Sequence, residues 1–263
     1  MSVYLELTAD FNRGRLRTIV CSGQAVVLLR LAIASKDGDW ILREDQESLD
    51  HVLGELGRRG ARYRFGAPMD LRWLRGGWSC HLEFPHEGTR VRTDFFTRPP
   101  RVSASRLANL WQEQEGKSPP FTAAADLLLI KQTAREKDWP IVGELARLLA
   151  DPADQMRHSR SARDLLALAA AHPELVVPLV RERPALAALS GGLDRLRIEL
   201  ERERFAAMDA DAQRVQRYLA AAAGLQSVWP ELERRMAELP LHQAHRLLVD
   251  SATACLPNCP TAS

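Results

Sequence analysis

From Arg17 to about Phe96 the chain mixes short apolar runs with amphipathic segments, a pattern typical of an α+β fold. The run TIVCS at residues 18–22 predicts a buried strand, and Gly23 to about Leu31 suits a helix. Trp40 to Leu42 predicts a second short strand. The apolar spacing of residues 46–60 then predicts an amphipathic helix that ends at its final glycine.

Two further strands are expected at HLEF, residues 81–84, and TRVRTDFF, residues 89–96, joined by the turn-like sequence PHEG. Alternation along the second of these places Val91 on one face and Asp94 on the other, beside two arginines. The register of this strand is only weakly specified, because Phe95 and Phe96 are both apolar.

After Arg101 the strand signals nearly vanish and the pattern becomes helical. The segments beyond Pro152 predict helices only, and no fixed-period repeat relates them. We therefore expect a sheet-containing domain over residues 1–152 and an all-α domain over 153–263. The C-terminal sequence CLPNCPTAS is expected to be mobile.

Composition narrows the class of protein. The chain has 263 residues, 46% of them apolar, and a formal net charge of +2, so no global excess of basic residues points to nucleic acid. No stretch reaches the roughly 18 apolar residues that a membrane span needs. Few, irregularly spaced cysteines argue against a disulfide framework and favour a reducing, cytoplasmic location.

Three aspartates carry the candidate chemistry. Residues i and i+2 of a strand point to one side, so Asp37 and Asp39 would project together, and a neighbouring strand could bring Asp94 opposite them. Carboxylate oxygens suit magnesium, and paired ions clamp the oxygens of a phosphoryl transfer. Upstream, Ser22 and Gly23 end a strand and open a helix, where backbone N–H groups can seat a phosphate.

This set, CSGQAV followed by KDGD and later TDFF, resembles the DNA polymerase beta-like nucleotidyltransferase superfamily, and in particular its small bacterial branch with abortive-infection and toxin–antitoxin members. The resemblance covers roughly residues 17–150. It implies a mixed sheet flanked by helices and a later helix with a lysine, followed by an Arg-x-Lys-Asp segment. The resemblance assigns catalysis and metal binding to Asp37, Asp39 and Asp94, and nucleotide binding to Ser22, Gly23, Lys36, Lys131 and Asp138.

The implied activity is transfer of a nucleoside monophosphate from an NTP, with two Mg²⁺ ions, to a hydroxyl of RNA, a protein or a small molecule. A role as a toxin or phage-defence component, with RNA or a cognate antitoxin-like protein as partner, follows from the resemblance alone. Two departures favour an alternative, a catalytically degenerate module that binds a nucleotide or partner. Gly38 replaces a large apolar residue, which predicts a weakened strand, and Ile33 replaces an arginine.

Plainer interpretations stay open for several residues. Lys131 could extend along a core helix towards water, and Asp138 could cap the helix that begins at Trp139. Basic clusters at 58–64 and 157–163 could follow an RNA backbone or form solvated faces. The charged helix at 192–205 predicts a self-paired face whose leucines could dock a partner. His242, His245, Cys255 and Cys259 could bind zinc, but the loose spacing of the cysteines favours a solvated helix with a disordered end.

Overall fold

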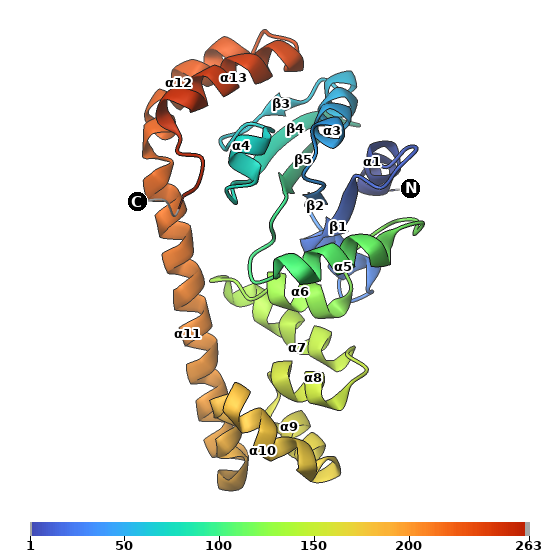
Figure 1. The fold of residues 1–263 in the computed structure, drawn as a ribbon, viewed down its shortest axis with the longest axis vertical. Coiled ribbons are helices and arrows are strands. Elements are labelled where there is room, and N and C mark those ends of the chain that lie inside the picture. Colours follow the sequence, from blue (N-terminus) through green and yellow to red (C-terminus); the bar gives the residue numbers. More distant parts are fainter. Residues whose placement is uncertain (1, 261–263) are drawn as a thin grey trace. The chain divides into compact units, whose positions relative to one another are not determined.

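The protein, described by a computed structural model over residues 2–260, has an α+β fold built on one five-stranded mixed sheet (Figure 1). The strands are β1 (Thr18–Cys21), β2 (Asp37–Leu42), β3 (Arg62–Tyr63), β4 (Cys80–His86) and β5 (Thr89–Phe96). Their order across the sheet is β1-β2-β5-β4-β3. The sheet is mixed because β2 runs parallel to β5, whereas every other neighbouring pair is antiparallel.

Helices account for most of the remaining described chain. In the first half they are α1 (Val3–Phe11), α2 (Ser22–Leu28), α3 (Gln46–Arg58), α4 (Leu71–Leu74), α5 (Ala104–Gln114) and α6 (Ala124–Ile130). They continue as η1 (Glu136–Asp138), α7 (Trp139–Arg147), α8 (Pro152–His158), α9 (Ala162–Ala171), α10 (Pro173–Glu182), η2 (Pro184–Gly191), α11 (Gly192–Ala221), α12 (Ala223–Met236) and α13 (Leu241–Cys255). Within residues 2–260, none of these helices is long and apolar enough to cross a membrane.

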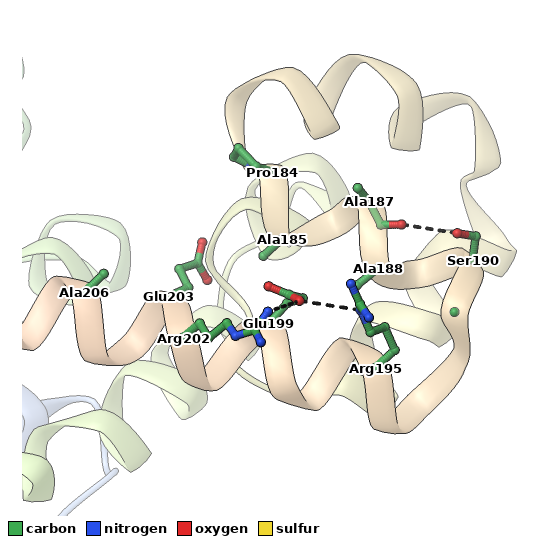
Figure 2. Close-up of a pocket in the computed structure, with 11 residues that line it drawn as sticks. Pro184, Ala185, Ala187, Ala188, Ser190, Arg195, Glu199, Arg202, Glu203 and Ala206 are labelled. Atoms are coloured by element: carbon green, nitrogen blue, oxygen red, sulfur yellow. Dashed lines mark hydrogen bonds and ion pairs between the residues drawn. The ribbon is translucent and has the colours of Figure 1, made fainter.

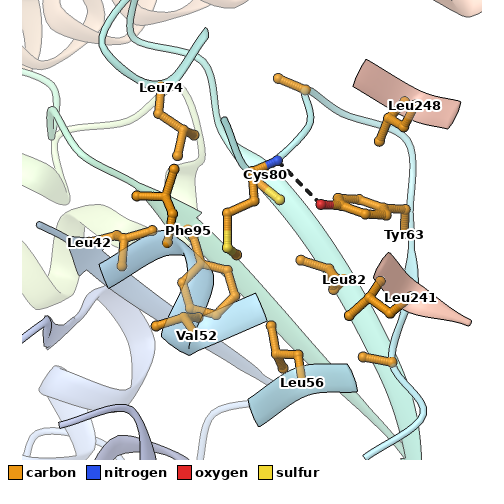
Figure 3. Close-up of a cluster of buried hydrophobic side chains, with 14 of the residues drawn as sticks. Leu42, Val52, Leu56, Tyr63, Leu74, Cys80, Leu82, Phe95, Leu241 and Leu248 are labelled. Carbon is orange, nitrogen blue, oxygen red and sulfur yellow. Dashed lines mark hydrogen bonds between the residues drawn. The ribbon is translucent and has the colours of Figure 1, made fainter. Parts of the chain in front are cut away.

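The chain forms two compact units. The first contains the sheet and extends to Thr122, with the segment from Gln216 onward added to it, and the second is Ala123–Val215. The expected domain boundary near residue 152 thus falls inside the second unit. The C-terminal helices α12 and α13 belong to the first unit, because apolar residues such as Leu241 and Leu248 complete the core beside the sheet (Figure 3). Helical periodicity predicts these helices correctly but does not say which core they join.

The core of the first unit lies on one face of the sheet. Trp40 of β2 stacks on Phe95 of β5 with ring centroids 5.4 Å apart, and Phe11 of α1 meets Trp40 edge-on at 5.4 Å. The sequence interpretation did not include α1. Its signal was the spacing of the buried residues Tyr4, Leu7 and Phe11, which repeats at helical intervals.

The segment after α13 is held in place, contrary to the expectation of a mobile tail. The indole N–H of Trp73 donates to the Leu256 carbonyl at 3.2 Å, and that of Trp78 donates to the Pro257 carbonyl at 2.8 Å. Gly76 lies so close to Asn258 that an added Cβ would be 1.7 Å from its carbonyl oxygen. Residues 261–263 lie outside the described part of the chain.

The second unit has its own core. Met156, Leu165, Leu179 and Leu196 are buried together from four different helices. Arg183 is also buried there, where its guanidinium donates to the Met156 and Ser159 carbonyls and pairs with Glu203 of α11. A buried arginine is tolerated because these acceptors replace its lost hydration.

Candidate functional site

The charged face of the sheet, opposite the aromatic core, carries the three predicted acids. We call it the polar face, and it consists of Asp37 and Asp39 from β2, Arg92 and Asp94 from β5, and His81 and Glu83 from β4. Side chains in a strand alternate, so the intervening Val91, Thr93 and Phe95 are buried on the other side. The sequence expectation for β5 is therefore confirmed, with Asp94 and Val91 on opposite faces.

Strand register brings the acids together. Asp39 is the direct partner of Asp94 across the parallel β2–β5 pair, and Asp37 is the partner of Arg92. On the far side of β5, His81 is the partner of Asp94. The polar face is thus a row of Asp39, Asp94 and His81 beside a second row that begins with Asp37 and Arg92.

Asp94 binds two nitrogen-bearing side chains through one oxygen. Its Oδ1 lies 2.8 Å from His81 Nδ1 and accepts a hydrogen bond from Arg64 Nη1 at 3.1 Å. Arg64 reaches this position because it extends the β3–β4 pairing, its backbone N–H donating to the His81 carbonyl at 2.9 Å. The carboxylate that sequence reasoning assigned to a metal ion is therefore engaged with a guanidinium and an imidazole.

The backbone of Asp37 is fixed by hydrogen bonds, whereas one oxygen of its side chain lacks a hydrogen-bond partner. Gln24 Nε2 donates to the carbonyls of Ser35 and Asp37 at 3.1 and 3.2 Å, which fixes the loop before β2 against α2. Asp37 Oδ1 is buried and has no hydrogen-bond partner among residues 2–260. Arg92 Nη1 lies 3.9 Å from this oxygen, too far for a hydrogen bond.

The pKa of the Tyr4 hydroxyl is affected by the charges of all three acids. Its hydroxyl donates to the Lys36 carbonyl at 2.6 Å, directly before β2. Burial raises the pKa of Tyr4, and the negative charges of Asp37, Asp39 and Asp94 raise it further, although a backbone hydrogen bond with Arg92 opposes this. All three carboxylates are therefore close enough to act on one phenol.

Gly38 leaves no gap in the packing, contrary to the sequence expectation, because aromatic rings fill the space beside it. An added Cβ would lie 2.3 Å from the Trp40 ring and 2.6 Å from Cδ1 of Tyr4. These two rings occupy the volume that a larger residue between the aspartates would fill. Trp40 is also anchored by its indole N–H, which donates to Thr8 Oγ1 at 3.0 Å.

The predicted phosphate seat lies at the β1–α2 junction. Ser22 begins α2 with a left-handed backbone, φ 51°, and an added Cβ on Gly23 would lie 2.2 Å from Ser35 Oγ. Gly23 is thus needed for close packing of the loop before β2. The Lys36 side chain is exposed. Ile33, at the position of the missing arginine, is also fully exposed, at 100%.

Lys131 and Asp138 belong to the second unit, whereas the three acids belong to the first. Lys131 Nζ donates to Asp138 Oδ1 at 3.3 Å, and both side chains are buried. Thr133 and Arg135 donate to the other oxygen of Asp138 at 2.6 and 2.9 Å. Asp138 makes no side-chain cap to α7, so the capping interpretation is wrong and the carboxylate neutralises Lys131 instead.

The other sequence candidates are mostly engaged in structural contacts. His245 stacks on Tyr63, and its Nδ1 lies 2.8 Å from the Tyr63 hydroxyl. In the cluster at 157–163, Arg157 pairs with Asp154 and Glu182. A pocket of about 810 Å³ in the second unit, between η2 and α11, contains none of the predicted site residues (Figure 2).

The three acids differ in how well they suit a magnesium ion. Across residues 2–260, no set of three or more histidine, cysteine, aspartate or glutamate side chains is arranged to hold a metal ion. Asp37 suits a cation, since its buried Oδ1 lacks a partner, and Asp39 lies on the same face two residues on. Asp94 would have to exchange Arg64 or His81 for an ion.

No protein-family model matches the chain, and comparisons with curated proteins and with solved structures found no match. The function must therefore be inferred from the polar face. Sequence reasoning found its acids but missed Tyr4, Gln24, Arg64 and His81. Of these, only His81 carried a usable signal, because it opens the strand that was expected beside the one with Asp94.

Proposed function

We propose that the protein is a magnesium-dependent nucleotidyltransferase that uses the polar face to bind an NTP and transfer its nucleoside monophosphate to an acceptor hydroxyl. The register of β2 and β5 carries this proposal, because it places Asp39 beside Asp94 with Asp37 on the same face. Nucleotidyl transfer needs metal ions held by carboxylates and little covalent help from the protein. The similarity of CSGQAV, KDGD and TDFF to polymerase beta-like nucleotidyltransferases supports the same reaction.

Each acid has a distinct part in this proposal. Asp37 and Asp39 hold magnesium, which would neutralise the phosphate oxygens of the NTP when bound. Gln24 positions Asp37 by fixing the backbone of the preceding loop. Asp94 would complete the site for the acceptor hydroxyl, either through the metal or by accepting its proton, while His81 and Arg64 hold the carboxylate in place.

The proposed phosphate contacts lie at the start of α2 and in the loop before β2. Ser22 and Gly23 at the start of α2, with the exposed Lys36, stay the predicted contacts to the triphosphate. Lys131 is a weaker candidate than the sequence suggested, because Asp138 already neutralises it. The acceptor is a hydroxyl of RNA, a protein or a small molecule, and the labelling experiment below distinguishes these classes.

The direct test is incubation of the purified chain with Mg²⁺, each α-labelled NTP, total RNA and cell extract. We expect label on one acceptor class, and its loss in Asp37→Asn and Asp39→Asn. Glu174→Gln, an exposed acid of α10, is the matched control and keeps activity. Transfer that survives both aspartate variants contradicts the proposal.

One observation favours a second function, a module of the same fold that binds a nucleotide or partner without transfer. Asp94 shares Oδ1 between Arg64 and His81, so the third acid is already neutralised in this arrangement. The module would bind a magnesium–nucleotide complex through Asp37 and Asp39 and leave it intact. Equilibrium binding of each NTP, measured together with the transfer assay, separates the two functions, because the module gives binding with no labelled product.

A further inference from the structure

Helix α11 carries an apolar repeat that neither the core of the second unit nor the polar face uses. Its members are spaced alternately three and four residues apart, with one position skipped after the first: Ile198, Phe205, Met208, Ala212 and Val215. This is the a and d spacing of a coiled coil, in which a seam of side chains packs against another helix. We call these five residues the seam.

The seam faces away from the core of its own unit. Leu196 and Leu200 of α11 are buried in that core, on the opposite side of the helix. By contrast Ile198 is 51% exposed, Phe205 58% and Val215 39%. Large apolar side chains along one line of a long helix are the mark of an interaction surface, not of a solvated face.

The charges beside the seam change sign along the helix. Arg195 and Arg202 occupy the e positions of the N-terminal half, and Asp209 occupies the e position that follows Phe205 and Met208. All three side chains are exposed, and Arg202 pairs with Glu199 of the same helix (Figure 2). Charged residues along the other edge of the seam have partners within the same unit. Arg204 pairs with Glu136, and Asp211 accepts a hydrogen bond from the Ala134 N–H.

We propose that the seam is the contact surface for a second copy of this chain, with the two α11 helices antiparallel. In an antiparallel pair each a residue faces a d residue, and e positions meet e positions. Centring the pair between Ala206 and Ala207 places Phe205 of each copy against Met208 of the other, a favourable sulfur–aromatic contact. The same register places Ile198 against Val215.

Charge complementarity selects this orientation. Antiparallel alignment sets Arg202 of one copy beside Asp209 of the other, and two-fold symmetry repeats the pair. A parallel pair would also have one attractive contact, Arg204 beside Asp209, but it would set Arg197 beside Arg202 and Glu201 beside Glu201, two repulsive contacts. Glu201, at the d position between Ile198 and Phe205, faces the small Ala212 and keeps its ion pair with Arg204 of its own helix.

The first experiment measures the mass of the full chain in solution over a dilution series by sedimentation equilibrium. We expect a monomer–dimer equilibrium. Phe205→Glu should raise the dissociation constant by about tenfold or more, because it places a charge in the buried centre of the seam. Val177→Glu, at an apolar residue of α10 that is more exposed (71%) than Phe205, is the control and should leave the equilibrium unchanged.

The second experiment tests orientation by exchanging the flanking charges. Arg202→Asp and Asp209→Arg should each weaken the dimer, and the double variant should restore it, since only the antiparallel register pairs these positions. Circular dichroism of each variant confirms that the helices are retained. A wild-type chain that stays monomeric throughout, or a double variant no tighter than the single ones, overturns the proposal.

Discussion

Asp39 and Asp94 are register partners on parallel strands, and this contact between β2 and β5 creates the polar face. Parallel pairing requires a long connection between the strands, which the chain supplies with α3, β3, α4 and β4. The acids therefore meet although 55 residues separate them in sequence, counted as 94 minus 39. One oxygen of Asp94 contacts two basic side chains, Arg64 and His81. Whether Asp94 is released from them distinguishes a transferase from a module that only binds a nucleotide.

Releasing Asp94 should strengthen metal binding. Arg64→Met removes the guanidinium from the Asp94 carboxylate, so we expect the chain to bind Mg²⁺ several-fold more tightly, measured by isothermal titration calorimetry. Arg62→Met, two residues earlier and exposed, is the matched control and should not change the affinity. Unchanged Mg²⁺ affinity in Arg64→Met would show that the guanidinium does not compete with a cation.

Gly38 should tolerate no side chain. Gly38→Ala places a Cβ within 2.3 Å of the Trp40 ring, so we expect a loss of about 1–3 kcal/mol in the free energy of unfolding, measured in urea. Gly54→Ala is the control because an added Cβ there would meet only Arg58, at 4.0 Å. That change should stabilise α3 by about 0.5–1 kcal/mol. Equal stability of the two variants would contradict the packing described for Trp40.

The Lys131–Asp138 pair should show a pH signature. Hydrogen bonds and the charges of Lys131 and Arg135 lower the pKa of Asp138 below its ordinary value, although burial, the largest single influence, acts to raise it. A carboxyl with a lowered folded-state pKa contributes stability above its unfolded pKa of about 3.9 and loses it as the pH falls through the folded value. The stability difference between the wild type and Asp138→Asn should therefore be full at neutral pH and shrink in acid.

At neutral pH, Asp138→Asn should cost about 3–5 kcal/mol because it leaves Lys131 buried without its counter-charge. Urea unfolding at a series of pH values measures both effects. The double variant Lys131→Met with Asp138→Leu should regain most of the loss, since it removes both charges together. A difference that does not change between neutral pH and acid would exclude the ionised carboxyl as the source.

Gln24 should act on the loop before β2 without changing the fold. Gln24→Leu removes the donor that holds the Ser35 and Asp37 carbonyls, so we expect faster amide hydrogen exchange in residues 31–38. Exchange in β5 should stay as it is in the wild type. Gln243→Leu, at an exposed residue of α13, serves as the matched substitution. Unaltered exchange in the loop would remove Gln24 from the set of positioning residues.

Local patterns were sufficient for much of the fold. Alternation placed Asp37 with Asp39 and separated Asp94 from Val91, because the two-residue period of a strand is fixed by backbone geometry. Helical periodicity likewise predicted the charged helix at 192–205, which forms the first half of α11. These features depend on residues a few positions apart, which the sequence displays directly.

Only the tertiary structure decided which distant residues meet. The pairing of Asp39 with Asp94, the fit of Trp40 over Gly38 and the neutralisation of Lys131 by Asp138 arise from contacts between separate elements. The same holds for α13, whose apolar face could have packed within a separate helical domain but completes the core beside the sheet. An apolar or charged side chain specifies the kind of partner it requires, whereas chain topology and packing select the particular one.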